Sequence, residues 1–275
     1  MIEKLLEKKY SKVVNILIFI FPVVIITLQV VGDIVLFILA MMGIFVAISK
    51  KISPFFIKEI KVFSYLTFGY FIAVCLSVIF SGKSSELAHF IPRDLHFLFA
   101  PFIALAIFKA NINMKYLLAG VKVSLLVIGM IIIYFGGGRA TGIMNPGVFG
   151  NLSVSLFFIV LVFYQHESFK HKVFTCLTLL FGLIAIVGSG TRGAWLSFLL
   201  LLVAYLYFVY KQKIKFSVRS KIIALIIMAS LISVGSFNES LKERVNSGYK
   251  QTYNWFSGSE AENAVSERLE MYSVG

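Results

Sequence analysis

Long apolar runs, separated by short polar and basic segments, follow one another along the chain as far as residue 237. Runs of about 20 apolar residues are long enough for an α-helix to cross a bilayer, and the alternation of a membrane β-strand is missing. The pattern therefore predicts an all-α, polytopic membrane helix bundle. Its nine expected spans are residues 13–31, 33–48, 62–80, 97–109, 115–135, 148–164, 173–188, 193–210 and 222–237.

Two of these spans have boundaries of special interest. Only Gly32 and Asp33 separate the first span from the second, so the sequence predicts a tight hairpin at these residues. The fourth span is short and has Pro101 near its start, and the helix can begin earlier, between Phe90 and His96.

The composition excludes a soluble domain, because 59% of the 275 residues are hydrophobic and only 14% are charged. A net charge of +13 would suggest nucleic-acid binding in a soluble protein, but here most Lys and Arg lie between apolar runs. Cys75 and Cys176 lie within apolar runs, so neither a disulfide framework nor a Cys-based metal site is expected. The first run follows a twelve-residue segment that carries four lysines and is not followed by a small-residue cleavage site, which indicates a retained span.

The distribution of cationic residues predicts the orientation of the bundle. Alternate connections hold seventeen Lys and Arg on one side and eight on the other. Cytoplasmic loops of membrane proteins contain more Lys and Arg than the loops on the outer side. We therefore expect a multi-pass protein of the bacterial inner membrane with a cytoplasmic N-terminus. The connections expected on the outer, periplasmic face are residues 81–96, 136–147, 188–193 and everything after about residue 238.

The chain changes from mainly apolar to mainly polar after the ninth expected span. Residues 1–237 are expected to form the transmembrane bundle, and the polar residues 238–275 the beginning of a large periplasmic loop. Two amphipathic helical stretches are expected within the loop, the second opening with capping-box spacing between Ser259 and Glu262. Because residues 268–275 read as a helix without a stop signal, we expect the protein to continue beyond Gly275.

The first candidate site is a Gly-rich break between two spans, Gly188-Ser189-Gly190-Thr191-Arg192-Gly193-Ala194-Trp195. Small residues allow a ligand to approach the backbone, and the guanidinium of Arg192 offers forked donors suited to phosphate oxygens. The alternative is a tight turn whose Arg reaches lipid headgroups.

The second candidate is the segment 136–147, which begins with three glycines and contains Arg139 and Asn145. It lacks the Gly-Lys-Ser/Thr ending of a nucleotide-binding loop. Arg139 and Asn145 could bind an anionic or sugar ligand, or the segment could simply be a flexible loop.

The third candidate is the segment 81–96. His89, Arg93 and His96 have helical spacing and could share one face, with Arg93 contacting a phosphate or lipid. The two His residues are two helical turns apart, which does not favour a metal site. A solvated interfacial helix is the alternative.

Three further cations have ambiguous surroundings. Arg268 and Arg244 lie in the polar C-terminal segment, where charged residues are usually just solvated. Lys122 lies within the fifth expected span and could either reach the membrane surface or line the bundle interior.

The motifs together resemble the O-antigen ligase family, which shares a core with O-antigen polymerases and bacterial O-oligosaccharyltransferases. The resemblance rests on Thr191-Arg192-Gly193 at the start of a span, on Gly142-Ile143-Met144-Asn145-Pro146, and on Glu267-Arg268-Leu269-Glu270-Met271-Tyr272 after the ninth span. The resemblance implies twelve spans and a large periplasmic loop after the ninth, so we expect this chain to correspond to a C-terminally truncated member.

The resemblance implies a glycosyl transfer from an undecaprenyl-diphosphate-linked glycan to lipid A-core. Arg192 and Arg268 match the family's two functional Arg positions and would bind the pyrophosphate. The catalytic His of the family would lie beyond Gly275, and neither His89 nor His96 takes its place. Such a transfer needs neither ATP nor a metal, because the glycosyl diphosphate departs with its own leaving group.

Three other functions remain open from the sequence. An O-antigen polymerase would use similar residues with a second lipid-linked glycan as acceptor. A flippase or other transporter would have ionisable residues deep in several spans, whereas only Lys122 qualifies. A truncated, inactive homologue is the third alternative.

Overall fold

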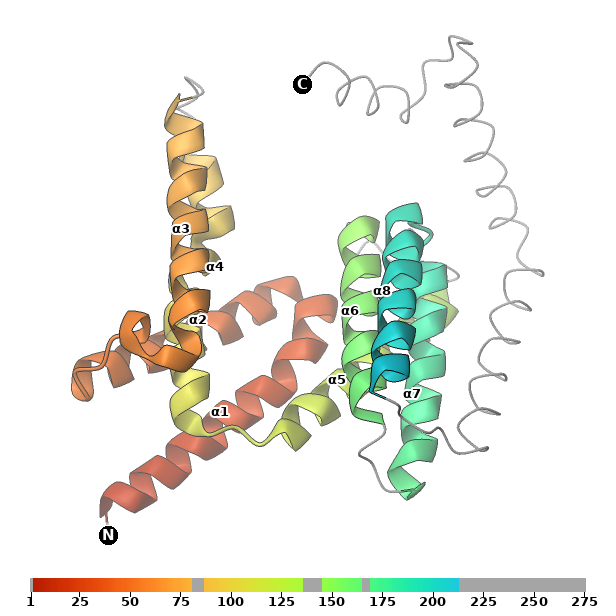
Figure 1. Ribbon diagram of the computed structural model, residues 1–275, viewed down its shortest axis with the longest axis horizontal. Coiled ribbons are helices and arrows are strands. Elements are labelled where there is room, and N and C mark those ends of the chain that lie inside the picture. Colours follow the sequence, from red (N-terminus) through yellow and green to blue (C-terminus); the bar gives the residue numbers. More distant parts are fainter. Residues whose placement is uncertain (1, 81–86, 136–144, 165–168, 213–275) are drawn as a thin grey trace. The chain divides into compact units, whose positions relative to one another are not determined.

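The computed structural model describes residues 2–80, 87–135, 145–164 and 169–212. This part of the chain contains α-helices, one 3-10 helix and no strand, as Figure 1 shows. The helices are α1 (Ile2–Thr27), α2 (Gln29–Ser49), η1 (Pro54–Phe56), α3 (Lys58–Phe80), α4 (Leu87–Ala110), α5 (Met114–Phe135), α6 (Pro146–Phe163), α7 (Phe169–Gly188) and α8 (Arg192–Lys211).

Seven of the eight described α-helices, all except α4, are long and apolar enough to cross a membrane. The chain is therefore a multi-pass membrane protein whose described elements are all helical. The third and the fifth to eighth expected spans fall on helices to within a few residues. The ninth expected span, residues 222–237, lies outside the described residues, as do the amphipathic stretches expected after it.

The predicted hairpin at Gly32 and Asp33 is wrong in its position. The helical break lies at Leu28, between α1 and α2, and Gly32 belongs to the first turns of α2. A Cβ on Gly32 would lie 2.8 Å from Cδ1 of Ile25, so this glycine lets the two helices pack closely after the break. Hydropathy could not reveal the break, because Leu28 is itself apolar and lies within a long apolar run.

The fourth expected span, residues 97–109, is only the second part of a longer helix. α4 begins at Leu87 and continues through Pro101, so residues 87–96 are helical rather than a loop connection. Asp94 is buried while His96 is exposed, so this stretch is not the uniformly solvated interfacial helix considered above.

The described helices form neighbouring pairs that are far apart in the sequence. The hydroxyl of Tyr10 in α1 donates to the carbonyl oxygen of Ala106 at 3.2 Å, and that of Ser11 to Ala110 at 2.7 Å. The side chain of Asn15 accepts a hydrogen bond of 2.9 Å from the backbone N–H of Asn113. α1 thus satisfies polar backbone groups at the junction of α4 and α5, which matters where no water is available.

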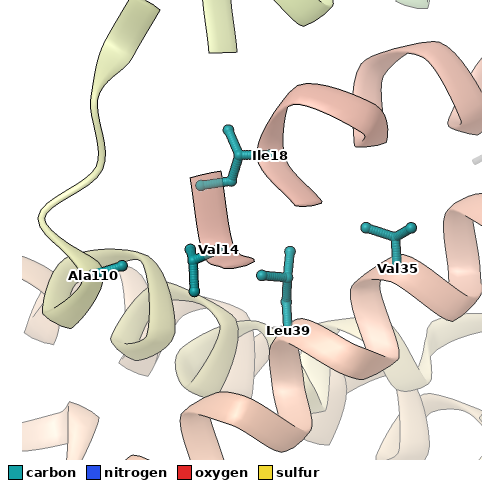
Figure 2. Packing of buried hydrophobic residues seen from close by; sticks show 5 residues of the cluster. All are labelled: Val14, Ile18, Val35, Leu39 and Ala110. Atoms are coloured by element: carbon teal, nitrogen blue, oxygen red, sulfur yellow. The ribbon is translucent and has the colours of Figure 1, made fainter. Parts of the chain in front are cut away.

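Buried hydrophobic side chains pack together in the same region, as Figure 2 shows. Its buried members come from α1, α2 and the end of α4. They are Val14, Ile18, Val35, Leu39 and Ala110.

Glycines allow the closest helix contacts. A Cβ on Gly43 of α2 would collide with the carbonyl of Phe102 in α4, and a Cβ on Gly120 of α5 with the carbonyl of Phe19 in α1. Small residues at such crossings are typical of membrane helix packing, where dispersion contacts replace the hydrophobic effect.

α5 is the most buried of the seven candidate spans and connects the helices before it to those after it. Its first half packs on α1, where Ser124 donates a 2.7 Å hydrogen bond to the carbonyl of Pro22. Its second half packs on α7, where Gly129 and Ile132 face Phe181 and Gly188.

The outward surfaces of α3 and α8 are apolar over most of their length. Exposed side chains include Leu66 and Ile79 on α3 and Leu196, Leu199 and Leu200 on α8. Such a surface would aggregate in water but is suited to contact with lipid tails.

The chain divides into two compact units, Met1–Tyr205 and Leu206–Gly275. All the contacts described here lie within the first unit.

Candidate functional site

Residues 189–191 form the compact turn between α7 and α8. Gly190 has φ of 64°, a left-handed conformation that favours glycine, and it ends α7 without strain. The N–H of Ser189 donates to the carbonyl of Ala185 at 2.9 Å, and the N–H of Gly190 donates to Val187 at 3.1 Å. The predicted Gly-rich break is therefore an ordered turn.

Arg192 is the first residue of α8. The carbonyl of Thr191, directly before it, accepts the first helical hydrogen bond, from the N–H of Trp195 at 3.3 Å. The N-terminus of a helix has a partial positive charge, which adds to a cationic residue placed there in attracting an anion. The side chain of Arg192 lies outside the described part of the structure.

The turn packs against two other helices of the first unit. A Cβ on Gly188, the last residue of α7, would collide with Ile132 near the end of α5. Gly150, near the start of α6, faces Ser189, Thr191 and Ala194 so closely that a Cβ there would lie 2.6 to 2.8 Å from their side chains. The end of α5, the start of α6 and the 189–191 turn therefore lie at the same end of this group of helices.

Asn145 has a defined structural role at this end. It is the N-cap of α6, and its side-chain oxygen accepts a 2.9 Å hydrogen bond from the N–H of Gly147. Asn145 itself is exposed. Its expected part in substrate binding stays a prediction, and Arg139 of the same motif lies outside the described residues.

The other expected site residues are only partly described. Arg93 lies in the first turns of α4, but its side chain and that of His89 are outside the description. Arg244 and Arg268 lie in residues that the structure does not describe. The described residues contain no group of three His, Cys, Asp or Glu able to hold a metal ion.

Lys122 lines the interior of the bundle. It is 6% exposed in the middle of α5, and its Nζ lies 6.0 Å from the ring centre of Phe174 in α7. Among the described charged side chains, only Lys122 and Asp94 are buried. The deep ionisable residues in several spans that a transporter would have are thus not seen in this part of the chain.

The sequence reasoning did not single out Gly150. A glycine inside an apolar span gave one possible signal, since glycine weakens an isolated helix and often marks close backbone packing. The partner of this close contact, however, is a turn forty residues later, and only the tertiary structure identifies it.

Comparison with known families concerns the same part of the chain. Residues 177–275 match the family model described as O-Antigen ligase, while no curated protein and no solved structure gives a match. The matched residues include the 189–191 turn, α8, Arg244 and Arg268. The resemblance seen in the motifs is confirmed over residues 177–275, which are similar to the O-antigen ligase family.

Proposed function

We propose that this protein transfers an O-antigen glycan from undecaprenyl diphosphate to lipid A-core during lipopolysaccharide assembly. The observation that carries the proposal is the O-antigen ligase match over residues 177–275, which includes both Arg192 and Arg268. The arrangement of the 189–191 turn supports it, because Arg192 begins a helix directly after this turn.

The reaction is a single displacement at the anomeric carbon. The bond between this carbon and the diphosphate oxygen breaks, and an acceptor hydroxyl oxygen of lipid A-core forms the new glycosidic bond. The hydroxyl proton goes to a general base, for which the family resemblance implies a His. Undecaprenyl diphosphate departs with the bonding electron pair, and neither ATP nor a metal enters the balance.

The two arginines would stabilise the departing diphosphate. Negative charge on its oxygens grows as the glycosidic bond breaks, so forked donors at this point bind the transition state better than the ground state. We assign this role to Arg192 and Arg268. Arg139, Asn145, Arg93 and Arg244 would contact the glycan or phosphate more peripherally.

Deletion of the gene in its host tests the reaction class. We expect polymer to disappear from lipid A-core while long lipid-linked polymer accumulates, because the donor is still made but not consumed. Gel analysis of lipopolysaccharide and of extracted lipid-linked glycans measures both. Single repeat units still attached to lipid A-core would instead indicate a polymerase. Loss of outward-facing lipid-linked glycan would indicate a flippase, and either result would contradict the proposal.

We also propose that the protein lies in the inner membrane with the 189–191 turn facing the periplasm. Once Cys75 and Cys176 are replaced by Ser, we expect Gly193→Cys to react with a membrane-impermeant maleimide in cells whose outer membrane has been permeabilised. Lys115→Cys, before the start of the hydrophobic part of α5, should react only after lysis. Both positions are exposed, so accessibility within the protein does not distinguish them. The reverse labelling pattern would overturn the orientation.

A further inference from the structure

The contact between α6 and the 189–191 turn is tighter than an ordinary helix crossing. A Cβ on Gly150 would lie 2.6 Å from Cβ of Ala194, 2.6 Å from Oγ1 of Thr191 and 2.8 Å from Oγ of Ser189. These three neighbours come from both sides of Arg192 in the sequence. Only glycine at position 150 allows the backbone of α6 to approach the turn this closely.

A small hydrogen-bond network holds the turn from within. Ser189 is fully buried, and its hydroxyl donates to the carbonyl of Ile186 at 2.7 Å. It also lies 3.1 Å from the hydroxyl of Thr191. The indole N–H of Trp195 donates to the same Ile186 carbonyl at 3.3 Å, so residues before and after Arg192 are tied to one point at the end of α7.

Aromatic packing extends the contact down α8. The ring of Phe198 lies 5.4 Å from that of Phe157 and 5.6 Å from that of Phe158, both in α6. Such ring pairs add to apolar packing and hold α8 along α6. The start of α8 is therefore fixed by backbone contact, hydrogen bonds and ring packing together.

We infer that Gly150 and the paired hydroxyls of Ser189 and Thr191 are positioning residues for Arg192. This inference rests on the proposed role of Arg192 in binding the diphosphate. Gly150 sets how closely α6 approaches the turn, and the hydroxyl pair sets the path of the backbone that leads into Arg192. A displacement of about 1 Å at a reacting centre can lower a rate by about 100-fold, so small errors in this turn affect catalysis more than stability.

The first test compares two glycines at which a Cβ would collide with a neighbouring segment. Gly150→Ala changes the contact at the turn before Arg192, whereas Gly43→Ala changes the crossing of α2 with α4 at Phe102, a contact that none of the proposed site residues makes. Transfer is measured with purified full-length protein in nanodiscs, using lipid-linked glycan as donor and lipid A-core as acceptor, per folded molecule. For Gly150→Ala we expect kcat/KM for the donor to fall about 10- to 100-fold with KM for the acceptor unchanged. Gly43→Ala should keep normal kinetics in its folded fraction.

A second pair of variants keeps the test valid if Gly150→Ala does not fold. Thr191→Val removes the hydroxyl at nearly constant volume and should lower kcat/KM for the donor, whereas Thr191→Ser keeps the hydroxyl and should restore most of it. Equal kinetics for Thr191→Val and Thr191→Ser, or for Gly150→Ala and Gly43→Ala, would show that the contact serves packing alone.

Arg192→Ala in the same assay separates the two proposals. If Arg192→Ala transfers glycan at the normal rate, the diphosphate role of Arg192 fails whatever Gly150 does. If Arg192→Ala is inactive while Gly150→Ala and Thr191→Val are normal, only the positioning inference fails.

Discussion

We expect Arg192→Ala and Arg268→Ala each to abolish attachment of polymer to lipid A-core, and lipid-linked polymer to accumulate in both variants. Each substitution removes a cation that would face the departing diphosphate. Loss of one preorganised donor at a developing oxyanion typically lowers a rate about 100- to 1,000-fold, and a full guanidinium supplies more than one hydrogen bond. Gel analysis of lipopolysaccharide, together with quantification of lipid-linked glycan, measures the effect in cells.

Two control variants sharpen this prediction. Arg192→Lys keeps the charge but loses the planar fork, so we expect a partial loss of ligation rather than a complete one. Arg219→Ala removes a cation from a connection expected on the cytoplasmic side and should ligate normally. If Arg192→Ala and Arg268→Ala both ligate like the unaltered protein, the diphosphate role is wrong.

We expect Gly43→Ala and Gly120→Ala to lower the stability of the folded protein, because both glycines are buried. In both, the new methyl group meets a backbone carbonyl of a neighbouring helix, which cannot rotate away as a side chain could. The helices must separate, at a cost of about 1–3 kcal/mol for each added methyl group. We expect a lower midpoint of thermal unfolding in detergent and a smaller monodisperse fraction.

Gly69→Ala is the matched control, because no atom lies within 4 Å of a Cβ built on this α3 residue. Alanine favours a helix over glycine by about 1 kcal/mol, so Gly69→Ala should be neutral or slightly stabilising. Equal unfolding midpoints for all three variants would refute the close crossings of α2 with α4 and of α1 with α5.

Hydropathy predicted the described helices well but not all their ends. The break at Leu28 escaped detection because an apolar residue interrupts the helix. The hairpin was instead predicted at Gly32 and Asp33, because these residues interrupt the apolar pattern. The early start of α4 was masked by Arg93, Asp94 and His96, which lower local hydropathy although the backbone is helical there. In both cases the backbone conformation depends on packing that residue types alone do not report.

The motifs of the candidate site could be predicted from the sequence, but the contacts between its residues in space could not. The Gly-rich break, its arginine and the family were all recognisable from residue types and order, and the family match over residues 177–275 agrees. Asn145 could be seen as a polar residue in a motif, but its use as the N-cap of α6 needed the structure. The partnership of Gly150 with Ser189 and Thr191 could not be read from the sequence.

By itself, the sequence determined that this protein is a helical membrane protein, because apolar runs of about 20 residues cross a bilayer as helices, which satisfy their own backbone hydrogen bonds within lipid. It also determined where the basic connections lie and which arginines belong to the family's motifs. Only the tertiary structure decided which helices touch, that Lys122 faces the interior, and that the start of α6 packs on the turn before Arg192. The physical reason is that close packing depends on the shapes of two surfaces at once, and a contact across forty residues leaves no periodic signal in either segment.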